Sequence, residues 1–454
     1  MRALLSGLRE SLKQKQTAFK WSPILQLCQW VVEQPREIPN RQVSKFDADP
    51  DWGWTRKAIA DLLSAGFEGG EGTIPFDLRD KVWSILKPLT DDPDPTPEYE
   101  EKYGGTNMDP ATLSINTTRG EAMHAVIRYA LWIRRHLEKG ESAPERLQRG
   151  FEDMPEVREV LDAHLDVRNE PSLAIRAVYG QWFPWLVLLD PEWARNNAAR
   201  IFPLDEQQQA FFDAAWTTYV TFCRPYDNVF DVIREQYRHA VGRIGSRRAD
   251  TRGIADPDEN LAEHFMELYW RGTLGLDDPL LDALWKNAPD DLRAHALDFV
   301  GRSLHNTSDP IPIDVLERLK TLWDRRLAEA KKAPTAHQQE VAAFGWWFVS
   351  GKFDPAWAIK HLGEALSIAG KVEPDYIVVE KLAEIAKQHP PEAVQCLKMI
   401  VEGDQKGWGI HTWREHARAI LAVALKDSSA RSQAESLIQY LGRRGHLDFR
   451  DLLQ

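Results

Sequence analysis

Residues 413–441 read WREHARAILAVALKDSSARSQAESLIQYL, and this stretch decides the fold class. Its apolar residues recur in steps of three and four, which places them on one face of a helix. The first face consists of Trp413, Ala417, Ile420, Leu421 and Ala424, and the second of Ala434, Leu437, Ile438 and Leu441. The stretch therefore predicts two amphipathic helices joined by a short polar turn.

The same spacing recurs along most of the chain. Examples are Leu4, Leu8 and Leu12; Val126, Tyr129, Ile133 and Leu137; Phe211, Ala215, Tyr219 and Phe222; and Val315, Leu319 and Leu322. Alternation of apolar and polar residues is rare, and no Asn-Gly or Asp-Gly turn joins two alternating runs. The pattern predicts an all-α protein.

The boundaries between these runs carry two recurrent signals. Asp-Pro precedes many of them, and we expect most of these dipeptides to begin helices, because Asp can accept the free amides and Pro loses no needed donor. They are Asp109-Pro110, Asp190-Pro191, Asp256-Pro257, Asp278-Pro279, Asp309-Pro310 and Asp354-Pro355. Glycine follows other runs, as at helix C-termini, at Gly140, Gly180, Gly301, Gly370 and Gly445.

One internal match hints at a repeat. Asp190-Pro191-Glu192-Trp193-Ala194 resembles Asp354-Pro355-Ala356-Trp357-Ala358, and the two lie 164 residues apart, four times 41. Two-helix repeats of the HEAT and armadillo type have about this length. With the alternation of helices and short turns, this predicts an all-α helical-repeat array, a HEAT/armadillo-like α-solenoid, from about residue 119 onward.

An acidic segment rich in Pro and Gly interrupts the pattern at residues 89–118. Its proline density disfavours a regular helix, so we expect a linker or a long functional loop. It would separate a smaller N-terminal helical part, residues 1–88, from the array at residues 119–454. A second irregular stretch, basic and glycine-containing, runs from Arg243 to Pro257.

Composition limits the function. The chain has 454 residues and a net charge of −12, which disfavours coating nucleic acid as its main task. It contains no apolar run long enough for a membrane span and no secretory signal. The three cysteines are widely separated, which favours a reducing cytoplasm over a disulfide scaffold. The 18 tryptophans indicate aromatic cores or aromatic surfaces.

Catalytic and cofactor motifs are absent from the sequence. It contains no G-x-x-x-x-G-K-[ST] loop, no H-E-x-x-H and no G-x-S-x-G. His264 and Glu267 have a spacing that can serve a metal, but no further ligands accompany them. Each cysteine lies in an apolar context that indicates a buried thiol. We therefore expect no enzyme activity, no cofactor and no metal.

Two alternatives stay open. Many tryptophans and acids on helices also fit an (α/α)-toroid carbohydrate-active enzyme, with Asp47, Asp49, Asp51, Trp52 and Trp54 as the most suggestive cluster. Most tryptophans, such as Trp285, Trp323 and Trp413, nevertheless follow helical apolar faces.

The second alternative is binding of nucleic acid through a basic loop, which would contain Arg243, Arg247, Arg248 and Arg252. The same loop could instead contact an acidic protein surface. The pairs Arg134-Arg135 and Arg325-Arg326 lie on predicted helices, where we expect them to face solvent.

Ser114-Ile115-Asn116-Thr117-Thr118-Arg119-Gly120-Glu121-Ala122 leads into a strongly predicted helix. Asn116, Thr117 or Thr118 could cap it, and Glu121 has the capping-box spacing from Thr118. Gly120 would permit close approach of a neighbouring segment, and Arg119 could pair with the acidic residues 91–101.

This N-T-x-R-G-x-A segment resembles a motif in the helical C-terminal regions of large bacterial anti-phage defence proteins, the STAND NTPases of the AVAST kind. The end of the chain, Ala417 to Leu421 and Ala434 to Leu453, is also similar. The resemblance covers about residues 75–454 and implies a sensor or scaffold array, with the chemistry in a separate nucleotide-binding core and effector. This chain has neither part.

The leading hypothesis is thus a cytoplasmic, non-catalytic helical-repeat protein that binds a partner. The partner would be a protein, either a phage protein or a companion defence subunit. Asn116, Arg119 and the loop residues Arg243, Arg247, Arg248 and Arg252 are the candidate contacts.

Overall fold

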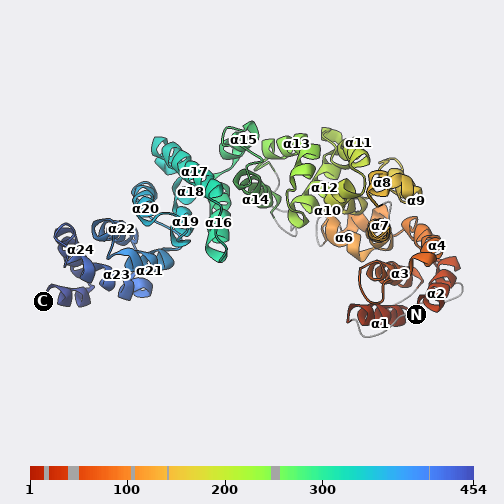
Figure 1. The fold of residues 1–454 in the computed structure, drawn as a ribbon, viewed down its shortest axis with the longest axis horizontal. Coiled ribbons are helices and arrows are strands. Elements are labelled where there is room, and N and C mark those ends of the chain that lie inside the picture. The colour runs from red at the N-terminus through yellow and green to blue at the C-terminus, as the bar shows by residue number, and fades with distance from the viewer. Residues whose placement is uncertain (15–19, 39–50, 104–107, 141–142, 247–255, 408) are drawn as a thin grey trace. The chain divides into compact units, whose positions relative to one another are not determined.

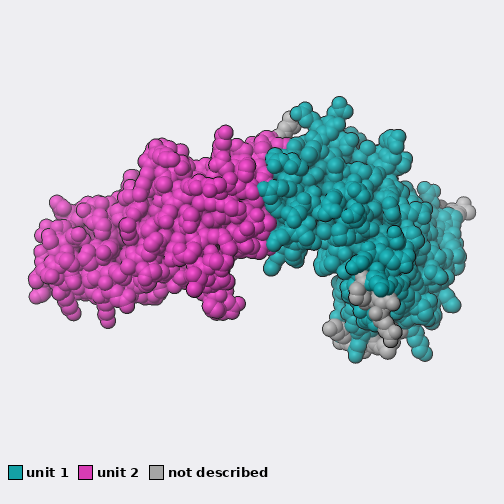
Figure 2. Space-filling model, turned by 45° about the horizontal axis from the view of Figure 1, so that its top comes forward, with its two compact units in different colours: residues 1–240, 247–257 teal, residues 241–246, 258–454 magenta. Residues whose placement is uncertain are grey.

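The computed structural model describes residues 1–14, 20–38, 51–103, 108–140, 143–246, 256–407 and 409–454. Within these ranges the regular elements are helices, and no strand is formed (Figure 1). The chain divides into two compact units, residues 1–240 with 247–257 and residues 241–246 with 258–454 (Figure 2). The predicted all-α helical-repeat array is confirmed.

Unit 1 contains the first thirteen α-helices, except for the last two residues of α13. Their bounds are α1 (Arg2–Lys13), α2 (Trp21–Glu33), α3 (Gly53–Gly66), α4 (Arg79–Thr90), α5 (Pro97–Tyr103), α6 (Pro110–Asn116), α7 (Thr118–Leu137), α8 (Ala143–Gln148), α9 (Pro155–His164), α10 (Leu173–Leu189), α11 (Pro191–Ile201), α12 (Gln209–Phe222) and α13 (Asp227–Gly242). Short 3₁₀ turns add η1 (Phe76–Leu78), η2 (Gly150–Asp153) and η3 (Glu206–Gln208).

Unit 2 contains the remaining helices, apart from Pro257 at the start of α14. Their bounds are α14 (Pro257–Trp270), α15 (Pro279–Asn287), α16 (Asp290–Asn306), α17 (Ile313–Lys332), α18 (Gln338–Ala342), α19 (Phe344–Val349), α20 (Pro355–Ala369), α21 (Asp375–Ile385), α22 (Pro390–Gly403), α23 (Ile410–Ala424) and α24 (Arg431–Arg443). Two 3₁₀ turns, η4 (Pro334–Ala336) and η5 (Leu447–Leu453), complete the unit.

The packing within unit 2 is that of a repeat array. Helices lie side by side in two rows (Figure 1). One row runs from α16 through α19 and α21 to α23, and the other runs from α18 through α20 and α22 to α24, so that from α18 onward the neighbours in a row are two positions apart in the chain. The array buries apolar faces that the sequence predicts. Trp323 of α17, which packs against α18 and α20, is fully buried and stacks on Phe344 of α19 with the ring centroids 4.7 Å apart.

In unit 1, α10 is the central helix. It packs against α6, α7, α11 and α12, and most of its length is apolar. The irregular segment expected at residues 89–118 lies inside this unit and contains the two short helices α5 and α6. The boundary between the two units instead falls near residues 241–258.

Asp-Pro begins helices at five of the six expected places, α6, α11, α14, α15 and α20. In the two matching pentapeptides, Asp190 accepts the Trp193 amide at 2.8 Å and Asp354 accepts the Trp357 amide at 2.9 Å. The exception is Asp309-Pro310, since α17 begins only at Ile313.

Two of the glycines expected at helix ends lie instead inside helices. A Cβ at Gly180 of α10 would approach the carbonyl oxygen of Ala215 on α12 to 2.0 Å, and one at Gly301 of α16 would approach Trp346 Cβ to 2.5 Å. These glycines allow two helices to cross closely, a tertiary requirement that the local sequence does not reveal. Gly370, with φ +67°, does end α20 as expected.

No helix among the described residues combines the length and apolarity that a bilayer span requires.

The tryptophans predicted to lie in the core are largely buried. Trp323 and Trp413 are fully buried, whereas Trp285 is half-buried with Arg326 Cζ 4.5 Å from its ring centroid.

The crossing at Gly180 gives a first prediction. We expect Gly180→Ala to lower the free energy of unfolding of unit 1 by about 2–4 kcal/mol, because α10 and α12 must separate to accept the methyl group. Gly7→Ala is the matched control, because a Cβ at this position in α1 meets no atom within 4 Å. The control should be neutral or stabilising by up to about 1 kcal/mol. Urea unfolding followed by circular dichroism measures the free energy of unfolding of both variants. Equal changes in the two variants would contradict the close crossing of α10 and α12.

Candidate functional site

The acidic segment 91–101 supplies the N-terminal cap of α7. The amide of Thr118 donates to Asp94 Oδ2 at 2.8 Å, and the amide of Arg119 donates to the Asp94 carbonyl oxygen at 2.8 Å. Thr117 and Thr118 make no side-chain cap, since these amides already have acceptors. A carboxylate at this end also compensates the positive end of the helix dipole.

The same segment caps α10 through Glu100. Its Oε2 accepts the Leu173 amide at 3.1 Å, its Oε1 accepts the Ala174 amide at 3.3 Å, and Ser172 Oγ also donates to it. Ser172 itself accepts the Ile175 amide at 3.2 Å. Two central helices of unit 1 therefore begin at carboxylates from one short segment.

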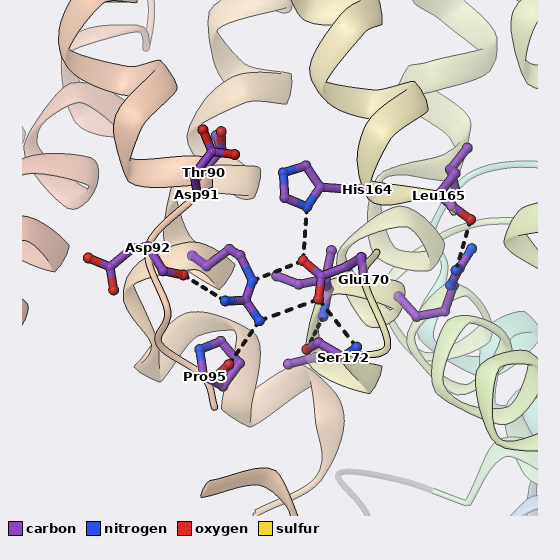
Figure 3. Close-up of polar contacts among 12 residues, drawn as sticks. Thr90, Asp91, Asp92, Pro95, His164, Leu165, Glu170 and Ser172 are labelled. Atoms are coloured by element: carbon purple, nitrogen blue, oxygen red, sulfur yellow. Dashed lines mark hydrogen bonds and ion pairs between the residues drawn. The ribbon is translucent and has the colours of Figure 1, made fainter. Parts of the chain in front are cut away.

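Arg119 joins this segment to the loop between α9 and α10. Figure 3 shows Asp92 and Pro95 of the segment beside Glu170 of the loop. The guanidinium of Arg119 donates to the carbonyl oxygens of Asp92 at 2.6 Å and Pro95 at 2.8 Å, and its Nε lies 2.9 Å from Glu170 Oε2. Glu170 is buried and also contacts His164 Nδ1 at 2.9 Å. Arg119 thus reaches the acidic segment through carbonyl groups, while its ion pair is with a residue outside it.

The other predicted contact residues are placed as follows. Asn116, the last residue of α6, is half-buried, and its Nδ2 donates to the Thr112 carbonyl oxygen at 2.9 Å. Arg243 belongs to unit 2, and its carbonyl oxygen accepts the Ser246 amide at 3.0 Å. Arg247, Arg248 and Arg252 lie outside the described residues. The structure therefore does not test this set as a whole, and its role in binding stays a prediction.

Two expectations about the α7 entry have clear outcomes. The close approach at Gly120 is confirmed, because a Cβ there would lie 2.1 Å from the Ser114 carbonyl oxygen. The capping box is wrong, because Glu121 is buried and accepts Ser64 Oγ of α3 at 3.3 Å. Asp94 caps the N-terminus of α7 in place of Glu121, and the Glu121 side chain packs against α3 instead.

A series of hydrogen-bonded side chains, Trp182, His124 and Ser114, lies next to the first turns of α7. Trp182 Nε1 donates to His124 Nδ1 at 2.7 Å, and His124 Nε2 lies 2.9 Å from Ser114 Oγ. Since Nδ1 accepts, Nε2 carries the proton and donates to Ser114. Burial lowers the pKa of His124 to about 3. A histidine that donates to the hydroxyl cannot activate it as a base, so this pair is structural.

The basic pairs also differ from expectation. Arg325 is exposed and pairs with Asp277 at 2.8 Å, but Arg326 is buried with its Nε 2.5 Å from Glu340 Oε1. Glu340 also binds Arg293 Nε at 2.6 Å and His337 Nδ1 at 2.7 Å. The predicted solvent face is therefore wrong for Arg326, because its tertiary partner lies on α18.

The aromatic and acidic cluster proposed for a sugar site is only partly described. Asp47 and Asp49 lie outside the described residues. Asp51 accepts the Gly53 amide at 2.7 Å and lies 3.9 Å from Arg36 Nε, while Trp52 packs edge-on against Trp30. Asp51 and Trp52 thus make structural contacts, whereas Trp54 is 40% exposed with Arg2 Cζ 5.0 Å from its ring centroid.

An apolar stripe is the feature of unit 1 that the sequence did not single out. We use this name for Trp185 and Leu188, which are 46% and 42% exposed and lie about one turn apart on α10, together with one exposed apolar side chain on each of two helices that pack against α10, Ile115 of α6 (50%) and Phe222 of α12 (47%). From Ala177 to Leu189, α10 has no charged residue. A helix that is apolar on all sides is normally covered on all sides.

Metal and thiol chemistry have no visible site in the part of the chain that the structure describes. No group of three or more His, Cys, Asp or Glu side chains there is arranged to hold a metal ion. None of the three cysteines forms a disulfide, and burial raises the pKa of each thiol to about 12.

No protein-family model matches the chain, and no curated protein is significantly similar to it. The resemblance to the defence proteins therefore stays a prediction, and a proposal about function has to start from the geometry above.

Glu121 gives a prediction about pH. Burial, and then the charge of Asp61, raises its pKa from 4.5 to about 7. The unfolded chain therefore releases this proton first, and the protein loses stability as the pH rises from 4.5 to 7. We expect Glu121→Gln to raise the free energy of unfolding at pH 8 by about 1–3 kcal/mol. At pH 4 the free energy of unfolding of this variant should be close to that of the wild type.

Urea unfolding at the two pH values checks this. Glu192→Gln is the control, because Glu192 is an exposed glutamate of the same unit (side chain 85% exposed) and its loss should be neutral at both pH values. Equal destabilisation by Glu121→Gln at both pH values would contradict the raised pKa.

Proposed function

We propose that the chain is a non-catalytic scaffold that binds a protein partner through the apolar stripe on α6, α10 and α12. The observation that carries the proposal is the exposure of Trp185 and Leu188 on a helix without a charge over thirteen residues. Exposed aromatic side chains beside arginines are the composition typical of binding hot spots. Repeat arrays commonly bind partners along such a surface.

The charges around the stripe favour an acidic, amphipathic partner segment. Arg128 lies with its Cζ 5.5 Å from the Trp182 ring centroid, and Arg134 donates to the Leu188 carbonyl oxygen at 3.0 Å. Their carboxylate partners, Glu68 and Glu138, are 64% and 45% exposed. The more exposed of the two pairs is Arg128 with Glu68, and exposed ion pairs contribute little, so a carboxylate of a partner can replace Glu68 at low cost.

The setting that we propose is bacterial anti-phage defence, in the cytoplasm, with a phage protein or a companion defence subunit as the partner. The support is the resemblance of the segment Ser114 to Ala122, together with the end of the chain. Nucleic-acid binding through the loop with Arg243 is the alternative. The carbohydrate-enzyme alternative has less support, since Asp51 is bound locally.

The stripe can be tested with two synthetic amphipathic helices that share one Leu/Phe face and carry either Glu or Lys on the other. We expect the Glu peptide to bind and the Lys peptide to bind at least about tenfold more weakly. Trp185→Glu should weaken binding of the Glu peptide at least about tenfold, since it puts a like charge at the anchor. Fluorescence anisotropy measures the dissociation constants.

Trp30→Ala is the matched control, because Trp30 is 48% exposed on α2, away from the stripe. It should bind like the wild type. Unaltered binding by Trp185→Glu, or equal binding of both peptides, would contradict the proposal. In lysates of phage-infected cells, the partner should be a protein that wild type and Trp30→Ala retain and Trp185→Glu loses.

A further inference from the structure

A cavity of about 460 Å³ opens between the α9–α10 and α11–α12 segments of unit 1. One wall is the start of the α9–α10 loop, Leu165 to Arg168, and the other is the end of α11 with the segment up to Gln208. The volume is in the range of small-ligand pockets, roughly 300–1,000 Å³. The loop that forms the first wall contains Leu165 and Glu170 (Figure 3), and the ion pair of Glu170 with Arg119 holds it in place.

The cavity lining carries two arginines, Arg168 and Arg200, and two aspartates, Asp166 and Asp205, of which only Arg168 and Asp166 form an ion pair. Arg168 binds both carboxylate oxygens of Asp166, at 3.1 and 2.8 Å, and this pairing lowers the pKa of Asp166 to about 2. Asp166 is thus already neutralised. Arg200 lines the cavity and donates to Asn197 Oδ1 at 2.8 Å, and no carboxylate of the described chain lies within ion-pair distance of it.

A second cation lies beneath the cavity. Arg176 is 1% exposed and donates to the carbonyl oxygens of Arg200 at 2.6 Å and Leu165 at 3.4 Å, two residues of the cavity wall. No described carboxylate lies within ion-pair distance of it either. A buried charge without a counter-charge costs free energy, and an anion nearby would offset that cost. This occurs in a chain whose net charge is −12.

The rest of the lining limits the kind of anion. Leu165, Val167, Pro203 and Leu204 supply apolar surface, and Leu204 is 42% exposed. Asp205 and Gln208 supply acceptors for N–H groups. A bare inorganic anion would use the cations alone. A peptide that ends in an apolar residue offers a carboxylate, an apolar side chain and an amide within one residue.

We propose that this cavity binds the free C-terminal carboxylate of a peptide whose last residue is apolar, with Arg200 as the ligand of the carboxylate. The cavity and the apolar stripe rest on different observations. Failure of either proposal therefore leaves the other intact, and both use the full chain.

The test is calorimetric titration with the acetylated tripeptide Gly-Ala-Leu, with its C-terminal amide and with inorganic phosphate. We expect the free acid to bind and the amide to bind at least about tenfold more weakly, because the charge-assisted hydrogen bonds are lost. Phosphate should bind more weakly than the acid, since it leaves the apolar wall uncovered.

Arg200→Gln should weaken binding of the acid at least about tenfold, without changing the unfolding midpoint, because Arg200 is exposed. Arg195→Gln is the matched control on the same helix, an exposed arginine outside the cavity lining. Equal binding of acid and amide, tighter binding of phosphate, or unaltered binding by Arg200→Gln would each overturn the proposal.

Discussion

The carboxylates that residues 91–101 place at two helix N-termini are the interaction on which unit 1 depends. Asp94 accepts the first amide of α7, and Glu100 accepts the first two amides of α10. Helix starts leave several amide groups without acceptors, and burying them unpaired costs free energy. The acidic, proline-rich segment, whose composition suggests a linker, therefore caps two helices inside the unit.

This arrangement positions the surfaces that could bind a partner. Glu100 fixes the start of α10, the helix that carries Trp185 and Leu188, and Arg119 fixes Glu170 in the loop that continues into the cavity wall. The two proposed binding features thus lie on elements whose ends are tied to one segment. Arg119, which the sequence suggests as a contact, is a positioning residue in this account.

The sequence is informative where the signal is local. Three- and four-residue apolar spacing predicts the helices, Asp-Pro predicts five of six expected helix starts, and Gly120 predicts a close contact. Each of these follows from residues within a few positions of one another.

Prediction fails where the partner is distant in the chain. Glu170 lies 51 residues from Arg119, Gly180 is required by α12, and Arg326 is buried because Glu340 lies on another helix. The apolar stripe and the cavity also depend on which helices become neighbours. Periodicity assigns a residue to a face of its helix, but it does not specify what covers that face.

Hydrogen exchange in Glu100→Ala tests the central claim most directly. The account predicts faster exchange of the Leu173 and Ala174 amides and of the adjoining loop, residues 165–172, with unchanged exchange in α17 to α24. Glu101→Ala removes the neighbouring exposed carboxylate and should leave all of these rates unchanged. Unaltered exchange at Leu173 and Ala174 in Glu100→Ala would contradict the claim that the acidic segment caps α10.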